Sequence, residues 1–167
     1  MTQAQFLFLL AFSVVNVVIA ATVVIMVREA RRIDGGGYWN REIFKRLGRL
    51  PTERSEANRM AFYTHRITGI AIFAFLVLHI VDVSLFAVSS SLYDDVHELY
   101  GSPVMRVFEC GLLFALLFHA LNGLRLVAID VWDVGAKVAT RLLTGVVATT
   151  LVVALAGSIV ILKPVIA

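Results

Sequence analysis

Long apolar stretches, separated by polar connections, run along the whole chain. Four of them reach the length of about 20 apolar residues that a helix needs to cross a hydrocarbon core. They span Gln5–Val27, Ile67–Val88, Val104–Leu124 and Leu142–Leu162. None shows the alternation typical of a strand, and a backbone in lipid must satisfy its own hydrogen bonds. The pattern therefore predicts four transmembrane helices.

The first span is predicted to be an uncleaved helix. A secretory signal carries basic residues before its apolar stretch, whereas the first charged residue here, Arg28, follows it. We divide the chain into an N-terminal transmembrane helix (1–27), a basic linker (28–62) and a three-helix core (63–167). The predicted fold class is an all-α membrane protein, with a three-helix core of a transmembrane bundle plus one extra N-terminal transmembrane helix.

The composition agrees with a membrane protein and limits the chemistry. Hydrophobic residues make up 59% of the chain and charged residues 16%, against about 45–50% and about 25% in a soluble domain. The single cysteine, Cys110, excludes an internal disulfide. It also excludes a zinc or iron–sulfur site that is built on several thiolates.

The charges of the connections predict the orientation in the membrane. Residues 28–66 hold ten Lys and Arg against five acidic residues, whereas residues 89–103 hold acidic residues and no Lys or Arg. The third connection carries Arg125, Lys137 and Arg141 near the helix ends. By the positive-inside rule the first and third connections are cytoplasmic and both termini are outside. A cytoplasmic flank also explains the basic linker, so no nucleic-acid partner is expected.

Ionisable residues lie inside the predicted membrane helices, where they are costly and therefore indicate function. The second span holds His79 and Asp82, and the third holds Glu109 and His119. At about 1.5 Å per residue, His119 lies about 9 Å from the cytoplasmic boundary and His79 about 20 Å. A difference of about 10 Å prevents the two from binding one haem iron. Glu109 is interpreted as an interfacial or interhelical hydrogen-bonding group.

His119 is a candidate ligand of a haem iron. It lies on one helix face with Gly111, Ala115 and Gly123, and these small residues leave room for a flat macrocycle. An imidazole without a partner in lipid is costly, which favours a ligand role. Ordinary packing of small residues between membrane helices is the alternative explanation of the stripe.

Two interpretations of His79 remain open. It binds a second haem together with a histidine of a partner chain, or it is a structural residue hydrogen-bonded to Asp82. Asp82 lies one turn further along the helix, so it can accept an imidazole N–H in either case.

Two arginines lie at the cytoplasmic mouths of these helices. Arg66 precedes the second span and Arg125 follows the third, so both are on the side where His119 lies. Cations there can pair with haem propionates or polarise a quinone carbonyl. Extension towards the lipid headgroups is the alternative.

Two short motifs resemble a known family. The segment His65-Arg66-Ile67-Thr68-Gly69 opens the second span, and His119-Ala120-Leu121-Asn122-Gly123-Leu124-Arg125 closes the third. Asp130 follows a few residues later. In this order they resemble the cytochrome b556 membrane-anchor subunit of succinate dehydrogenase, respiratory complex II. The resemblance covers about residues 63–162, and the first span has no counterpart in the common three-helix form.

The resemblance implies a shared haem b. His119 would be an axial ligand, with a histidine of a second membrane-anchor subunit opposite. His65 and Arg125 would lie near the haem propionates. A further haem at His79 would make two haems, both shared with the partner subunit.

The resemblance also implies a pocket for ubiquinone or menaquinone beside the iron–sulfur subunit. Arg66, Asp130 and Thr68 would line it. Where the family often has a serine that contacts quinone, this chain has Phe62.

By this resemblance the chain is an anchor and electron-transfer subunit of succinate:quinone oxidoreductase, an enzyme of the tricarboxylic acid cycle, in a bacterial plasma membrane. It would hold the flavoprotein and iron–sulfur subunits to the membrane, since it has no dicarboxylate-oxidising site of its own. One alternative is the anchor of a fumarate reductase, which runs the reverse reaction. Another is a haem-free transmembrane scaffold or a transporter, with His79 and Asp82 as a proton relay.

Overall fold

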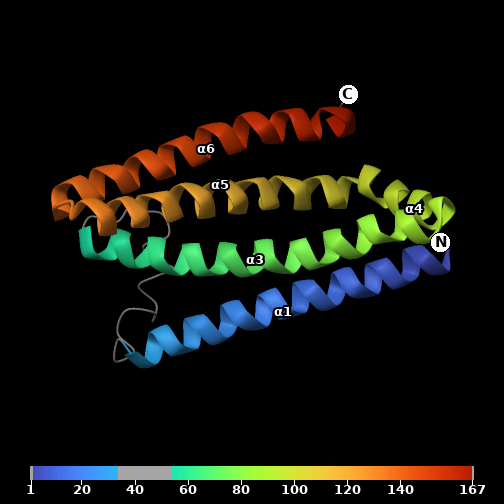
Figure 1. Cartoon of the computed structure of the whole chain (residues 1–167), viewed down its shortest axis with the longest axis horizontal. Helices are drawn as coiled ribbons and strands as arrows, with labels where there is room; N and C mark the ends of the chain where they lie inside the picture. Colours follow the sequence, from blue (N-terminus) through green and yellow to red (C-terminus); the bar gives the residue numbers. More distant parts are fainter. Residues whose placement is uncertain (1, 34–53, 167) are drawn as a thin grey trace.

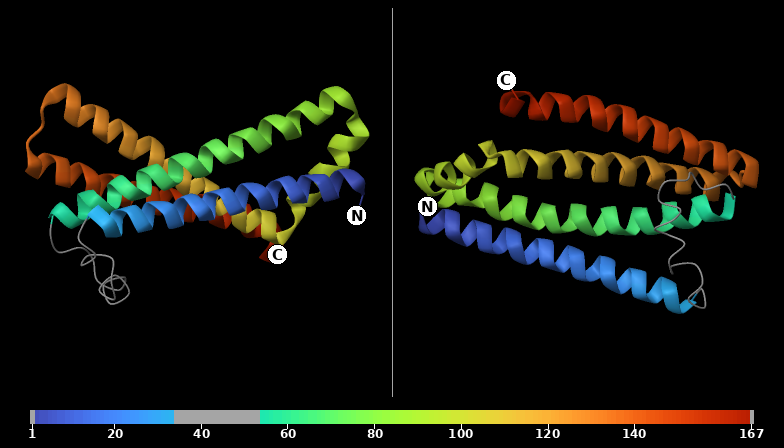
Figure 2. Two further views of the ribbon diagram at one scale, coloured as in Figure 1. Left: turned by 90° about the horizontal axis from the view of Figure 1, so that it is seen from below. Right: turned by 180° about the vertical axis from the view of Figure 1, so that it is seen from behind.

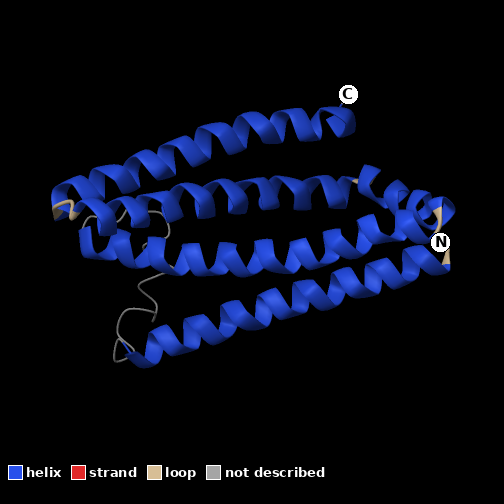
Figure 3. Cartoon of the chain, in the orientation of Figure 1, coloured by secondary structure: helices blue, strands red, loops and turns tan. Residues whose placement is uncertain are grey.

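The computed structural model describes residues 2–33 and 54–166, and this part of the chain is helical, without strands (Figure 3). Its elements are α1 (Gln3–Ile33), α3 (Arg54–Val88), α4 (Ser90–His97), the 3-10 helix η1 (Glu98–Gly101), α5 (Pro103–Trp132) and α6 (Ala136–Ile166). Four of them, α1, α3, α5 and α6, are long and apolar enough to cross a membrane. The predicted four-helix, all-α membrane fold is confirmed.

The helices extend beyond the apolar stretches that predicted them. Helix α3 begins at Arg54, well before Ile67, and α1 continues to Ile33. Helical hydrogen bonding continues past the hydrocarbon core, whereas hydropathy marks only the apolar part. The segment assigned to the basic linker, 28–62, therefore includes the end of α1 and the start of α3. Its middle, 34–53, lies outside the described residues.

Local signals set the ends of α5. The side chain of Ser102 accepts a hydrogen bond from the backbone N–H of Met105 at 3.4 Å, and Pro103 occupies the first helical turn. Both are typical of a helix N-terminus. At the other end Asp133 adopts a left-handed conformation, with φ of 45°. The chain then turns into α6.

Polar side chains of the first span are satisfied within their own helix. Ser13, Asn16 and Thr22 each donate a hydrogen bond to the carbonyl four residues earlier, at 2.8–2.9 Å. Such bonds replace those that water would make. This lets α1 carry polar residues through lipid without a partner.

Helix α5 lies between α3 and α6, and α1 packs on α3 (Figures 1 and 2). We call one end of the bundle the basic end; it contains the end of α1, the start of α3 and the α5–α6 turn. The opposite, acidic end contains both termini, α4 and η1 (Figure 1). Helix α1 lies close to α3 at the acidic end and further from it at the basic end (Figure 1).

One small apolar cluster lies at each end. Phe8, Val96 and Met105 join α1, α4 and α5 at the acidic end. At the basic end Ala61, Phe118 and Leu143 join α3, α5 and α6. The rest of each apolar helix surface is largely exposed, as expected where lipid or another membrane subunit covers it.

Candidate functional site

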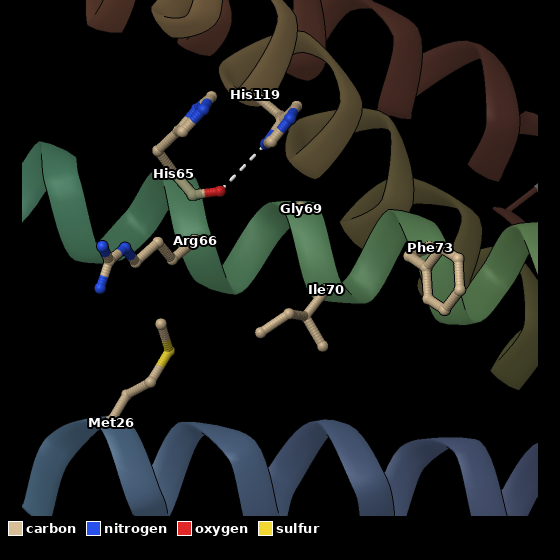
Figure 4. A pocket seen from close by; sticks show the side chains of 7 residues that line it. All are labelled: Met26, His65, Arg66, Gly69, Ile70, Phe73 and His119. Carbon is tan, nitrogen blue, oxygen red and sulfur yellow. Dashed lines mark hydrogen bonds between the residues drawn. The ribbon is translucent and has the colours of Figure 1, made fainter.

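Two histidines from neighbouring helices meet in the basic half of the bundle. The rings of His65 (α3) and His119 (α5) are stacked, with centroids 4.0 Å apart and planes 4° from parallel. The Nδ1 of His119 lies 2.9 Å from the backbone carbonyl oxygen of His65, and the two are hydrogen-bonded (Figure 4). The resemblance implies that both residues lie near one haem, and the structure brings their rings into contact.

This hydrogen bond determines which nitrogen of His119 is free. A carbonyl oxygen only accepts, so Nδ1 carries the proton, and in a neutral ring Nε2 keeps its lone pair. Nε2 has no hydrogen-bond partner among the described residues. A metal-binding histidine usually has this arrangement, with one nitrogen donating to a carbonyl and the other free for the metal.

Thr68 lies next to this hydrogen bond. Its buried hydroxyl is within 2.8 and 3.0 Å of the carbonyl oxygens of Thr64 and His65, and 3.5 Å from Nδ1 of His119. The hydroxyl therefore faces the α3 backbone and His119. It lines neither of the two cavities described below.

Gly69 allows His119 to approach α3. A Cβ atom at position 69 would lie 2.7 Å from Cε1 of His119, too close for any real side chain. On α5, a Cβ at Gly123 would lie at an ordinary 3.5 Å from His65, and one at Gly111 would meet open space. The small residue that lets His119 approach α3 is therefore Gly69, on the facing helix. The predicted role of the stripe on α5, room for a macrocycle, stays a prediction.

A cavity of about 420 Å³ opens beside His119, and we call it the His119 cavity. Its lining comes from three helices and is mostly apolar: Met26 of α1, then His65, Arg66, Gly69, Ile70 and Phe73 of α3, and His119 of α5 (Figure 4). A volume of roughly 300–1,000 Å³ with a few polar groups is typical of small-molecule and cofactor sites.

A second cavity, of about 580 Å³, lies nearer the basic end, and we call it the basic-end cavity. Its polar lining comes from α3 and α5: Asn58, His65, Arg66, Asn122 and Arg125. Phe62 of α3 and apolar residues of α5, α6 and the turn between them complete it. His65 and Arg66 line both cavities, so they form a common wall between an apolar space and a cationic one.

Arg66 is exposed, and its guanidinium carbon lies 3.9 Å from the centroid of the Phe62 ring. This is a cation–π contact. Within the described residues Arg66 makes no ion pair, so its charge is available to an anion or a carbonyl oxygen.

Arg125 is buried and ties three helices together. Its guanidinium donates to the side-chain oxygens of Asn58 on α3 at 2.6 Å and Asn122 on α5 at 3.3 Å. It also donates to the carbonyl of Ala139 on α6 at 3.1 Å. The alternative in which Arg125 extends to the lipid headgroups is therefore wrong, because its side chain turns inward.

Asp82 is paired with Tyr100, and not with His79. The Tyr100 hydroxyl donates to the buried Asp82 carboxylate at 3.1 Å. Burial, and secondly the charge of Asp82, raise the pKa of Tyr100 well above its ordinary value. His79 is exposed on α3, where its ring stacks on Phe75 with centroids 5.7 Å apart. The hydrogen bond between His79 and Asp82, which the structural interpretation of His79 predicted, is therefore not formed.

The offset between the two deep histidines is larger than the sequence suggested. His119 packs against Gly69, and residues 69 and 79 are roughly 15 Å apart along α3. The sequence-based value was about 10 Å. The larger offset strengthens the conclusion that His79 and His119 cannot both bind one iron.

The remaining acidic candidates lie apart from the two cavities. Glu109 pairs with Arg106 on the same helix at 3.6 Å, which agrees with an interfacial role. Asp130 is exposed and lines neither cavity. In residues 2–33 and 54–166, no group of three or more His, Cys, Asp or Glu could hold a metal ion.

Sequence reasoning missed several partners in these sites. Asn122 lies three residues before Arg125, and this spacing on one helix face could have revealed the pair. The contacts of Asn58, Tyr100 and Met26 join segments that are far apart in the sequence, so no local sequence pattern predicts them.

Comparison with known proteins gives the family context. Residues 41–160 match the family described as succinate dehydrogenase/fumarate reductase transmembrane subunit. The chain is 39% identical over 93 residues to succinate dehydrogenase 2 membrane subunit SdhC of Mycobacterium tuberculosis, covering 54% of this chain and 68% of that one. It is 32% identical over 98 residues to the succinate dehydrogenase hydrophobic membrane anchor subunit of Halobacterium salinarum, covering 54% and 75%. The family match contains α3, α5 and most of α6, and it leaves out α1.

Proposed function

The chain belongs to the succinate dehydrogenase/fumarate reductase transmembrane-subunit family, and we propose that it binds haem b on His119 and helps to form a quinone site. In this role it anchors a flavoprotein and an iron–sulfur subunit to the membrane. The observation that carries the proposal is the His119 ring, whose Nδ1 is held by the His65 carbonyl while Nε2 remains free.

The residues around His119 fit a haem. The cavity beside it is mostly apolar, and His65 and Arg66 are its other polar lining residues. The buried Nδ1 of His65 has no hydrogen-bond partner in the described part of the chain, and it can bond to a group brought in by a ligand. A bound haem b would supply one-electron storage next to the quinone site.

The second axial ligand is proposed to come from a second membrane-anchor subunit. His79 is too far along α3, and His97 lies on α4 at the acidic end. The His65 ring stacks beside His119, so it cannot reach the opposite face of the same iron. The four histidines of the chain therefore supply one ligand for this haem.

We place the quinone in the basic-end cavity, with Arg66 as its direct contact. Arg66 is the one of the three expected quinone residues that lines this cavity, where Arg125 lies as well. Thr68 is assigned to the positioning of His119, because its hydroxyl faces that ring. Asp130 lines neither cavity. We propose that it contacts the quinone only where the pocket borders the iron–sulfur subunit.

A second haem at His79 is a separate proposal. An exposed imidazole at this depth needs a partner in the membrane, and Asp82 already bonds to Tyr100. A histidine of the second anchor subunit, with a distal haem between, provides that partner.

The proposed orientation places the basic end in the cytoplasm of a bacterium and both termini outside the plasma membrane. The soluble subunits then meet the basic-end cavity, where protons for quinone reduction come from water. Both similar proteins are named as succinate dehydrogenase subunits, which favours succinate oxidation over fumarate reduction.

Purification of the complex through a tag on this chain tests the proposal. We expect succinate-dependent quinone reduction and the α-band of a b-type cytochrome in the reduced-minus-oxidised spectrum. A complex that contains this chain but shows no such band would leave the haem-free scaffold as the better description.

A further inference from the structure

Helix α1 takes part in the His119 cavity although it lies outside the three-helix core. Its contribution is Met26, whose side chain points from α1 towards Arg66 on α3 (Figure 4). Met26 is half-buried, whereas its neighbour Ile25 is 59% exposed. One face of α1 therefore contributes to the cavity lining, and the adjacent face looks outward.

Contacts at the acidic end hold α1 in this position. The Gln5 amide donates to the carbonyl of Asp95 at 2.9 Å and to the Glu98 carboxylate at 3.4 Å. The Phe8 ring packs against Tyr100 with centroids 5.8 Å apart. With this end fixed, α1 runs beside α3, and Met26 joins residues of α3 and α5 in the lining of the His119 cavity.

We propose that α1 is the outer wall of the haem pocket, and that the Met26 side chain packs against the bound haem and shields it from lipid and water. This inference rests on the proposed binding of haem at His119. A methionine suits such a wall, because its flexible, polarisable side chain fills irregular apolar space. The polarity of the surroundings of a haem sets its retention and its reduction potential.

The test uses the full complex and three variants of α1. Met26→Gln places an amide in the wall at nearly constant size, Ile25→Gln places the same amide on the outward face, and Met26→Leu restores an apolar wall. Transfer of haem to excess apomyoglobin measures retention, and a redox titration gives the midpoint potential. We expect Met26→Gln to release haem about tenfold faster, because an amide would be buried against the macrocycle. Its midpoint potential should fall, because a polar wall favours the charged ferric form.

Ile25→Gln and Met26→Leu should both match the wild type. If Met26→Gln is not recovered in the membrane, Met26→Ala replaces it and should also release haem faster, through the opening left in the wall. Equal release and equal potential in the wild type and in the Met26 and Ile25 variants would overturn the inference. If at the same time His119→Ala still abolishes the haem, the proposed function stands and only the role of α1 fails.

Discussion

The imidazole rings of His65 and His119 lie parallel and 4.0 Å apart, and the backbone carbonyl of His65 accepts the Nδ1 proton of His119. One residue of α3 thus contacts the face of the His119 ring and also fixes its tautomer. The ring cannot turn without breaking this bond. Changes on α3 that disturb the contact should therefore resemble changes of His119 itself.

Gly69→Ala tests this coupling directly. The added methyl group would lie 2.7 Å from Cε1 of His119, so the ring must move or α3 must shift. Overpacking of this kind costs about 1–3 kcal/mol. We expect a lower haem content and a shifted α-band in the purified complex. Gly145→Ala, on α6, is the matched control, since a methyl group there meets open space; an equal effect of the two substitutions would refute the close approach.

Arg66→Leu should impair quinone reduction without stopping succinate oxidation. Loss of one charge-assisted hydrogen bond to a quinone carbonyl should raise the apparent KM for quinone by roughly tenfold or more. Succinate oxidation with a phenazine-type acceptor, which bypasses quinone, should change little. Arg106→Leu, at the other end of α5, is the control and should leave both assays unchanged. Equal loss of both activities in Arg66→Leu would indicate failed assembly instead of a quinone role.

The number of haems tests the proposal for His79. His119 packs against Gly69, and Gly69 and His79 are roughly 15 Å apart along α3. A ligand role for His79 therefore requires a separate iron. We expect about two haems per flavin in the wild type, one bound at His119 and one at His79. His79→Ala should lower this ratio by half. A ratio of one haem per flavin in the wild type would rule out the distal haem at His79.

Tyr100→Phe should destabilise the acidic end. It leaves the buried Asp82 carboxylate without its donor, at a cost of about 1–3 kcal/mol in the free energy of unfolding. The raised pKa of Tyr100 means that its contribution is fully present below its unfolded pKa of about 10. The contribution is lost as the pH rises through the higher pKa of the folded state.

Thermal unfolding in detergent between neutral pH and pH 11 measures this difference. The advantage of the wild type over Tyr100→Phe should be constant near neutral pH and shrink above about pH 10. Tyr93→Phe is the control, because the Tyr93 ring stacks on His97 and its hydroxyl makes no hydrogen bond among the described residues. A pH-independent difference between wild type and Tyr100→Phe would show that ionisation of this phenol is not linked to stability.

The sequence predicted the helices and the candidate His119 for physical reasons that are local. Hydropathy identifies the segments that contact lipid, and a histidine inside such a segment can be recognised from the sequence alone. The helix ends were less predictable, because α3 continues from Arg54 as a polar helix that hydropathy does not detect.

The contacts between helices could not be predicted in the same way. The sequence paired Asp82 with His79 because they lie one turn apart, but the structure pairs it with Tyr100, which reaches α3 through α4 and η1. Arg125 likewise finds Asn58 on another helix. Such partners depend on the relative placement of the helices, which cannot be predicted from the pattern of a single sequence.

The proposed function depends most on His119 as a haem ligand, and the reduced-minus-oxidised visible spectrum of the purified His119→Ala complex tests this most directly. We predict the loss of the α-band of one b-type haem, while the chain remains inserted in the membrane and bound to its partner subunits. Haem content and a spectrum unchanged from the wild type would contradict the assignment of His119.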